Sequence, residues 1–205
     1  MWVFPDEKHS GLRDFLAERY HARGRHEEAM ELAWSQFTEA PNLEGYRWLK
    51  DHADRAGDWA AWWEKVLLRV REDLDRRKQE SQSWYLSRLV GHSELVRIYL
   101  WEGEVEAAWR ETKEGNCSDE LWIELAGLRE EYAPEESLEI YFGRIEPLIQ
   151  ETNYKAYVAA YALLRKSREL MQRLDREPEF AGYLEFIRLE HKRKRNFMKL
   201  LDGME

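Results

Sequence analysis

The sequence has few of the features that tie a protein to an oxidising compartment or a membrane. It contains one cysteine, Cys117, so an intrachain disulfide and a cysteine-based zinc site are both excluded. Its longest nearly pure apolar run, YVAAYALL at 157–164, is far shorter than the ~20 residues that a membrane-spanning helix requires. The first residues, MWVFPDEKHSG, lack the basic start and apolar core of a signal peptide. We therefore expect a cytoplasmic protein.

Catalytic motifs are also missing. The eleven glycines form no GxGxxG or GxxxxGK[ST] phosphate loop, and the six histidines contain neither HExxH nor a pair spaced i, i+4. Carboxylates are abundant, but nothing in their spacing selects an acid–base pair. His21 and His26 flank Gly24 and are expected to approach each other across a turn as an ordinary histidine pair. We therefore predict a non-enzymatic protein without a metal, a cofactor or a small-molecule substrate.

The residues that are abundant favour helices. Ala, Leu, Glu, Arg and Lys dominate, and apolar side chains recur three and four positions apart, as in the stripe of Leu12, Phe15, Leu16 and Tyr20. Glycines follow such stripes where a left-handed C-terminal cap is expected, and Asn42, Asp58, Ser118 and Asn153 precede new ones as expected N-caps. The predicted helices are 10–23, 26–39, 43–56, 59–78, 83–102, 104–114, 119–131, 134–150, 154–175 and 178–190, with a short tail helix at 194–202.

A repeat organises these helices. When Gly24 and Gly103 are aligned, Tyr20 and Tyr99 precede them by four residues, and Ala29 and Ala108 follow by five. Gly24 and Gly57 are 33 residues apart, close to the 34-residue period of the tetratricopeptide repeat, which this pattern resembles. Gly57 and Gly103 are 46 apart, and the charged stretch 71–83 accounts for the excess as a longer second helix or an insertion.

We therefore expect an all-α fold, an α-solenoid of antiparallel, tetratricopeptide-like helix pairs with about ten helices. A single helical-repeat domain is predicted for residues 1–205. It has regular repeats at about 10–117, divergent helix pairs at about 118–190 and a basic tail at 191–205.

A narrower resemblance follows from the order of several segments. GRHEEAMELAWSQFTEAPNLEGYRWLK, GDWAAWWEKVLLRVRE, LWEGEVEAAW, TNYKAYVAAYALLRKSREL and HKRKRNFMKLLD together resemble the helical C-terminal region of bacterial SWIM zinc-finger proteins. The resemblance implies a tetratricopeptide-like region beside a zinc module that binds DNA or proteins. One cysteine cannot supply the CxC…CxH ligand set, so the chain is either a piece of a longer protein or a member without the finger, and DNA binding is not carried over.

Three tryptophans in GDWAAWWEK are the first candidate site. Trp59, Trp62 and Trp63 share one side of a helix. In the repeat alignment Trp62 occupies the slot of Ala29 and Ala108, while Ala53 occupies the tyrosine slot, so Trp62 is predicted to fill the core in a large-for-small exchange. Trp59 and Trp63 are less constrained, and either complete that packing or face a protein partner.

The basic run 191–195 is the second candidate. The net charge of −9 argues against nucleic acid as a partner of the whole chain, but Lys192, Arg193, Lys194 and Arg195 could contact phosphates or an acidic partner, with Phe197 available for stacking. The competing interpretation is a solvated helix end, where cations suit the helix dipole. The leading hypothesis is a non-enzymatic scaffold that binds a protein or peptide. The alternative is a nucleic-acid-associated accessory region.

Overall fold

The protein is helical throughout the part of the chain that the structure describes. A computed structural model describes residues 7–80 and 91–204, which form eleven α-helices, one short 3-10 helix and their connecting turns. The predicted all-α fold of tetratricopeptide-like helix pairs is confirmed. The chain divides into two compact units, Met1–Ser118 and Asp119–Glu205. Nine of the ten tryptophans precede this boundary, and Trp122 follows it.

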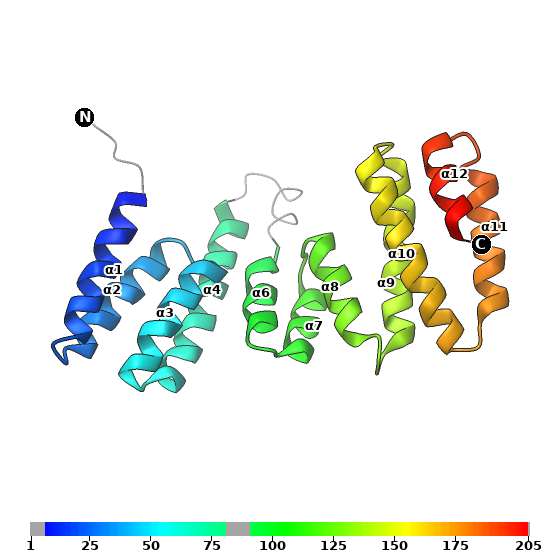
Figure 1. The fold of residues 1–205 in the computed structure, drawn as a ribbon. Helices are drawn as coiled ribbons and strands as arrows, with labels where there is room; N and C mark the ends of the chain where they lie inside the picture. Colours follow the sequence, from blue (N-terminus) through cyan, green and yellow to red (C-terminus); the bar gives the residue numbers. More distant parts are fainter. Residues whose placement is uncertain (1–6, 81–90, 205) are drawn as a thin grey trace, which may run out of the picture. The chain divides into compact units, whose positions relative to one another are not determined.

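The described residues of the first unit, 7–80 and 91–118, form three antiparallel helix pairs. They are α1 (Glu7–His21) with α2 (His26–Glu39), α3 (Leu43–Ala56) with α4 (Trp59–Glu80), and α6 (Ser93–Trp101) with α7 (Val105–Glu114) (Figure 1). Helix α2 packs against α3, and the first helices of successive pairs touch, α1 with α3 and α3 with α6. Neighbouring pairs therefore bury each other's apolar faces, as a repeat architecture requires.

Small residues and glycine turns make this stacking close. Ala29 and Ala108, which are equivalent in the repeat alignment, are completely buried. So is Ala53, which stands where the other two repeats have a tyrosine. Gly24, Gly57 and Gly103 have φ angles of 73°, 76° and 79°. In this left-handed region a side chain would be strained, so the predicted glycine caps are confirmed.

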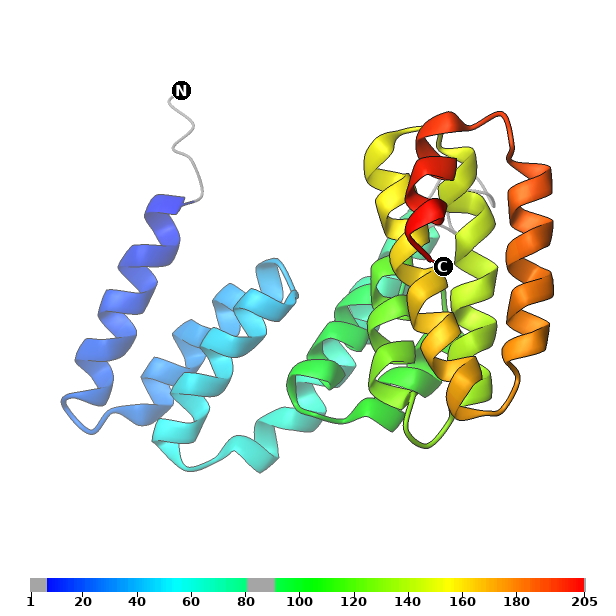
Figure 2. The same cartoon turned by 45° about the vertical axis from the view of Figure 1, so that its right-hand side comes forward.

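The second unit is also built from antiparallel helices. It contains α8 (Asp119–Arg129), α9 (Pro134–Gln150), α10 (Tyr154–Arg173), α11 (Glu177–Glu190), α12 (Arg195–Leu201) and the 3-10 helix η1 (Asp202–Met204). Helices α8 to α11 pack in succession, α8 on α9, α9 on α10 and α10 on α11, and α12 returns against α10 (Figure 2). Tyr141 and Ile145 of α9, with Leu164 of α10, are fully buried in a core that also takes up Phe197 and Leu201 of α12.

Most helix boundaries agree with the sequence prediction. The helices 26–39, 43–56 and 134–150 have the predicted bounds, and α4 extends to Glu80, so part of the predicted excess at 71–83 is a longer helix. The prediction of one continuous helix over 83–102 is wrong, because residues 91 and 92 are not helical and α6 begins at Ser93. The first part of that predicted helix, 83–90, lies outside the described residues.

The predicted N-caps have different outcomes. The side-chain oxygens of Asn42 and Asn153 accept hydrogen bonds from Gly45 N and Ala156 N, both at 2.8 Å, and these two caps are confirmed. At Asp58 the backbone carbonyl accepts from Ala61 N. The Ser118 hydroxyl is buried without a hydrogen-bond partner, so its predicted capping role is wrong.

Candidate functional site

The first candidate site is an aromatic surface in the first unit, made by Trp59, Trp63 and Trp101 around Tyr46. Tyr46 lies on α3 and is completely buried, whereas Trp59 and Trp63 at the start of α4 are half-buried. The Tyr46 ring centroid is 5.6 Å from that of Trp59, 6.1 Å from Trp63 and 5.7 Å from Trp101, each in an edge-on arrangement. Such geometry is favourable for aromatic pairs, so Tyr46 orients all three indoles.

An ion pair runs through the aromatic surface. The Lys50 ammonium lies 5.0 Å from the Trp59 ring centroid and 5.2 Å from that of Trp101, and it donates to both carboxylate oxygens of Glu102 at 2.7 and 2.8 Å. The Tyr46 hydroxyl donates to the same carboxylate. Burial, and then the hydrogen bond to Glu102, raise the pKa of Tyr46 far above its usual range. The phenol therefore stays a donor, and the charge of Lys50 is compensated within the surface.

The three tryptophans of GDWAAWWEK have divided roles. Trp59 and Trp63 contribute to packing around Tyr46 yet remain partly exposed, and Trp101 of the next helix pair is 42% exposed beside them. Trp62 packs against Trp34, with ring centroids 5.5 Å apart, but it is only half-buried. The prediction that Trp62 fills the core is therefore wrong. Ala29 and Ala108 at the equivalent repeat position are fully buried, but the indole is larger and stays partly exposed.

A further candidate site is a row of three histidines that joins α1, α2 and α3. His21 Nδ1 is 2.7 Å from His26 Nδ1, and His21 Nε2 is 2.9 Å from His52 Nδ1. The predicted contact between His21 and His26 is thus present. His52 of α3, in the next repeat, makes a second contact with His21. A hydrogen bond in each nitrogen–nitrogen contact requires one proton between the two rings, so between neutral rings the tautomer of one determines that of the next.

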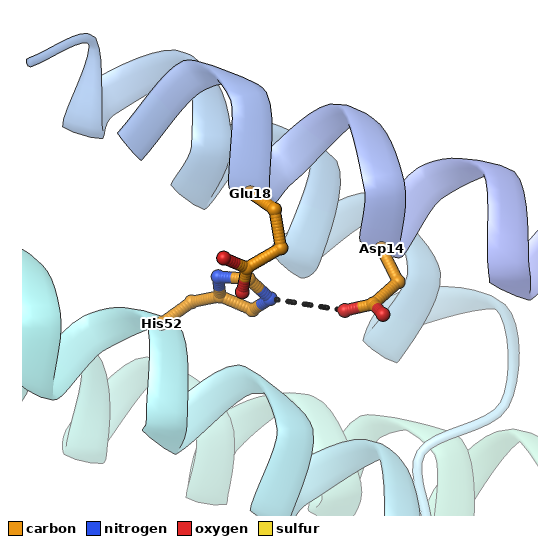
Figure 3. Close-up of side chains that lie close together, drawn as sticks. All are labelled: Asp14, Glu18 and His52. Atoms are coloured by element: carbon orange, nitrogen blue, oxygen red, sulfur yellow. Dashed lines mark ion pairs between the residues drawn. The ribbon is translucent and has the colours of Figure 1, made fainter. Parts of the chain in front are cut away.

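Two carboxylates of α1 face His52, the last histidine of this row. Asp14 and Glu18 are four residues apart and so share one face of the helix. Figure 3 shows both above the His52 ring, whose Nε2 points to Asp14 Oδ1 at 3.8 Å. One potential ligand atom from each of these three residues lies within 4.8 Å of the other two. We call these three residues the histidine–carboxylate cluster.

Neighbouring side chains donate hydrogen bonds to the two carboxylates of the cluster. Trp48 Nε1 donates to Asp14 Oδ1 at 2.7 Å, and the Arg55 guanidinium pairs with both oxygens of Glu18. The hydrogen bonds from Arg55 lower the pKa of Glu18. Burial lowers the pKa of His52, and burial together with the nearby charge of His52 lowers that of His21. These effects favour neutral imidazoles beside an ionised carboxylate.

Sequence reasoning identified His21 and His26 but missed the cluster itself. Asp14 and Glu18 at i, i+4 were the available signal, combined with His52, which lies close to one repeat period beyond Glu18. A search for ligand motifs within single helices does not find such a set, because its members come from the first helices of two successive pairs.

The basic segment is partly integrated into the second unit. Lys192, Arg193 and Arg195 are exposed, whereas Lys194 Nζ donates to the Ile149 carbonyl at 2.9 Å near the end of α9. Phe197 is completely buried against Tyr157, with ring centroids 5.5 Å apart. The prediction that Phe197 is available for stacking on bases is therefore wrong. Its ring closes the core that α12 shares with α10.

No helix in the described part of the chain has both the length and the apolar character needed to cross a membrane.

No protein-family model matches the chain, and no curated protein does. Among solved structures, the chain is similar to a crystal structure of nearly identical TPR-like repeats from a Podosopora anserina protein named as a kinesin light chain. The identity is 14%, the match covers 93% of this chain and 100% of that chain, and the TM-score is 0.41.

Proposed function

We propose that this protein is a non-enzymatic helical-repeat scaffold that binds a protein or peptide through the aromatic surface. The observation that carries the proposal is the exposed Trp101 ring, held beside Trp59 by Tyr46 and by the Lys50–Glu102 ion pair. Tryptophan is enriched among the residues that dominate interface energies. An indole already held in place loses less conformational entropy on binding than a free side chain, so this surface suits a partner.

The charges around the aromatic surface favour one kind of partner segment. Glu102 compensates Lys50, but Arg47 is exposed, and its guanidinium lies 5.6 Å from the Trp101 ring centroid. An apolar side chain would pack on the indoles, and a neighbouring carboxylate would pair with Arg47. The partner is therefore a peptide segment that places an aromatic or aliphatic residue next to an acidic one.

A peptide-display selection on the full chain tests this function. We expect enriched peptides to combine an apolar and an acidic residue, and Trp101→Ala to weaken their binding by about tenfold or more. Leu68→Ala is the matched control, because Leu68 is a 60% exposed apolar residue on α4 of the same unit. Enriched peptides that bind Trp101→Ala and Trp59→Ala as tightly as the parent would contradict the proposal.

Contact with nucleic acid remains the alternative function, and the exposed side chains of Lys192, Arg193 and Arg195 favour it. It predicts an affinity for duplex DNA that falls steeply with salt and drops when these three cations are changed to glutamine. Binding unaffected by that change would exclude the segment as a contact. Membership of the SWIM zinc-finger family likewise stays a prediction, based on the order of the sequence segments.

A further inference from the structure

The donor atoms of the histidine–carboxylate cluster are those that a divalent transition metal prefers. The cluster offers an imidazole nitrogen from His52 and carboxylate oxygens from Asp14 and Glu18, all within 4.8 Å of one another. Zinc bonds to such atoms at about 2.0–2.2 Å, which places the ligand atoms of a tetrahedral site roughly 3.3 Å apart. The carboxylates therefore have to move inward by about 1–1.5 Å to bind an ion.

The structure divides the ligands into one fixed residue and two adjustable ones. His52 is 2% exposed, stacks on His21 at 5.1 Å with an interplanar angle of 4°, and meets the Trp48 ring edge-on at 4.6 Å. Asp14 and Glu18 are about half exposed, at 54% and 46% of their side-chain area. These exposed side chains can rotate toward the imidazole, and in doing so Asp14 would exchange its hydrogen bond from Trp48 Nε1 for a bond to the ion.

His52 Nε2 points into the cluster without a hydrogen bond to its facing carboxylate. The 3.8 Å to Asp14 Oδ1 is too long for one. A metal ion placed between Nε2 and the two carboxylates would bond to this nitrogen and to both acids. Figure 3 shows the nitrogen directed toward that space, with Asp14 and Glu18 on the helix above it.

The other nitrogen of His52 already has the outer-shell partner that a metal ligand needs. A metal on Nε2 requires the ring proton on Nδ1, which would donate to His21 Nε2 across 2.9 Å. His21 would then donate from Nδ1 to His26 Nδ1 across 2.7 Å. Metal-bound histidines characteristically donate their second N–H in this way, which orients the ring and strengthens it as a ligand.

The three histidines themselves do not form the ion site. His21 contacts His26 through Nδ1 and His52 through Nε2, on opposite sides of its ring, so one ion cannot replace both contacts. The metal position is therefore between His52 and the two carboxylates of α1. Arg55 pairs with Glu18 and offsets one of the two negative charges. Its side chain is 45% exposed, so it can move aside when Glu18 binds the ion.

We infer that Asp14, Glu18 and His52 bind one divalent transition-metal ion of the zinc class, with His21 and His26 as its outer-shell relay. Three protein ligands leave a coordination position for water, which distinguishes this site from a closed four-ligand structural site. The inference is independent of the aromatic surface, since it depends on α1 and on different residues of α3.

Zinc titration against a chromogenic chelator, with the purified full chain at pH 7.5, tests the inference. We expect one Zn²⁺ per chain, and binding weakened tenfold or more in Asp14→Asn, Glu18→Gln and His52→Gln. His21→Gln removes the relay but no ligand and should weaken binding by about tenfold, as outer-shell changes do. Glu39→Gln is the matched control, because Glu39 is an exposed carboxylate that pairs with Arg13 in the same helix pair.

Two results would overturn the site. One is Zn²⁺ binding of equal stoichiometry and affinity in Asp14→Asn and Glu18→Gln, which would make the ion an adventitious surface cation. The other is no binding by the parent chain at micromolar Zn²⁺. Both carboxylates are exposed, so their variants are expected to fold, and circular dichroism of each variant verifies this. With Co²⁺ as the probe, visible d–d absorption should appear in the parent and disappear in His52→Gln.

Discussion

The hydroxyl group of Tyr46 donates a hydrogen bond to a carboxylate oxygen of Glu102 at 2.5 Å, although the two residues are 56 positions apart in the chain. Lys50 binds the same oxygen at 2.7 Å. These bonds connect α3 of the second helix pair to the end of α6 in the third. The residues that orient the tryptophans of the aromatic surface therefore also join two repeats.

Removing the two partners of this bond should have unequal effects. Tyr46→Phe deletes the donor but leaves Glu102 paired with Lys50, so we expect a loss of about 1 kcal/mol in the free energy of unfolding. Glu102→Ala leaves the buried phenol and the ammonium without their acceptor, and should cost about 1–3 kcal/mol. Urea unfolding of both variants measures the difference. Equal losses would show that the carboxylate has no special role at this joint.

Glycine at position 115 is required for space. A Cβ atom there would lie inside van der Waals contact with the His92 ring, which is buried and pairs with Glu111. We expect Gly115→Ala to destabilise the protein by about 1–3 kcal/mol through overpacking.

Gly182 provides the opposite case. It is exposed within α11, and a Cβ atom there would meet nothing within 4 Å. Gly182→Ala should therefore stabilise the protein by about 0.5–1 kcal/mol, because alanine loses less backbone entropy in a helix. Thermal melts of the two variants should shift in opposite directions, and a shift of the same sign would refute the packing argument.

The ion pair of Glu146 with His191 should make the second unit sensitive to acid. Partial burial acts to raise the pKa of Glu146, but hydrogen bonds from Gln150 and His191, with the charges of His191 and Lys194, lower it overall. A carboxyl group with a lowered folded pKa adds stability above its unfolded pKa, about 4.3, and loses it as the pH falls through the folded value.

We therefore expect Glu146→Gln to reduce stability near pH 6 and to flatten the loss of stability below about pH 4.3. Urea midpoints measured between pH 3 and 7 check this. Glu185→Gln, which changes an exposed carboxyl group on α11, serves as the control. If the parent and Glu146→Gln lose stability in parallel over the acid range, the pair makes no such contribution.

The N-cap of α10 is the fourth test. Asn153 Oδ1 accepts a hydrogen bond from Ala156 N, one of the free amides of the first helical turn. Asn153→Ala should cost about 0.5–2 kcal/mol, whereas Asn153→Asp should preserve the cap. Aspartate matches asparagine in size and keeps the acceptor, so comparing the two unfolding midpoints separates loss of the acceptor from a general effect of substitution at this position.

The sequence predicted helix boundaries well, because these depend on local chemistry. Glycines in the left-handed region end α3 and α6, asparagines begin α3 and α10, and Pro134 begins α9. Each signal acts within a few residues of the boundary, so it can be read without knowing which helices become neighbours. The repeat spacing then predicted the pairing.

Side-chain destinations were harder to predict, because they depend on contacts between helices. The stripe of Leu12, Phe15 and Leu16 identified α1, yet these side chains are exposed, and Ala17 faces the core. The nucleic-acid interpretation of the basic segment made Phe197 available for stacking, but this side chain is fully buried. The histidine–carboxylate cluster combines residues from α1 and α3, and only the stacking of successive repeats brings them together.

The uneven distribution of tryptophan between the two units gives the first unit a fluorescence signal that the second barely shares. Nine indoles belong to Met1–Ser118, and Trp122 is the one in Asp119–Glu205. Intrinsic fluorescence therefore follows the first unit almost alone, whereas far-ultraviolet circular dichroism follows the helices of both. Fluorescence and dichroism melts that separate would show two cooperative folding units, and superimposed melts would show that the helix pairs unfold as one.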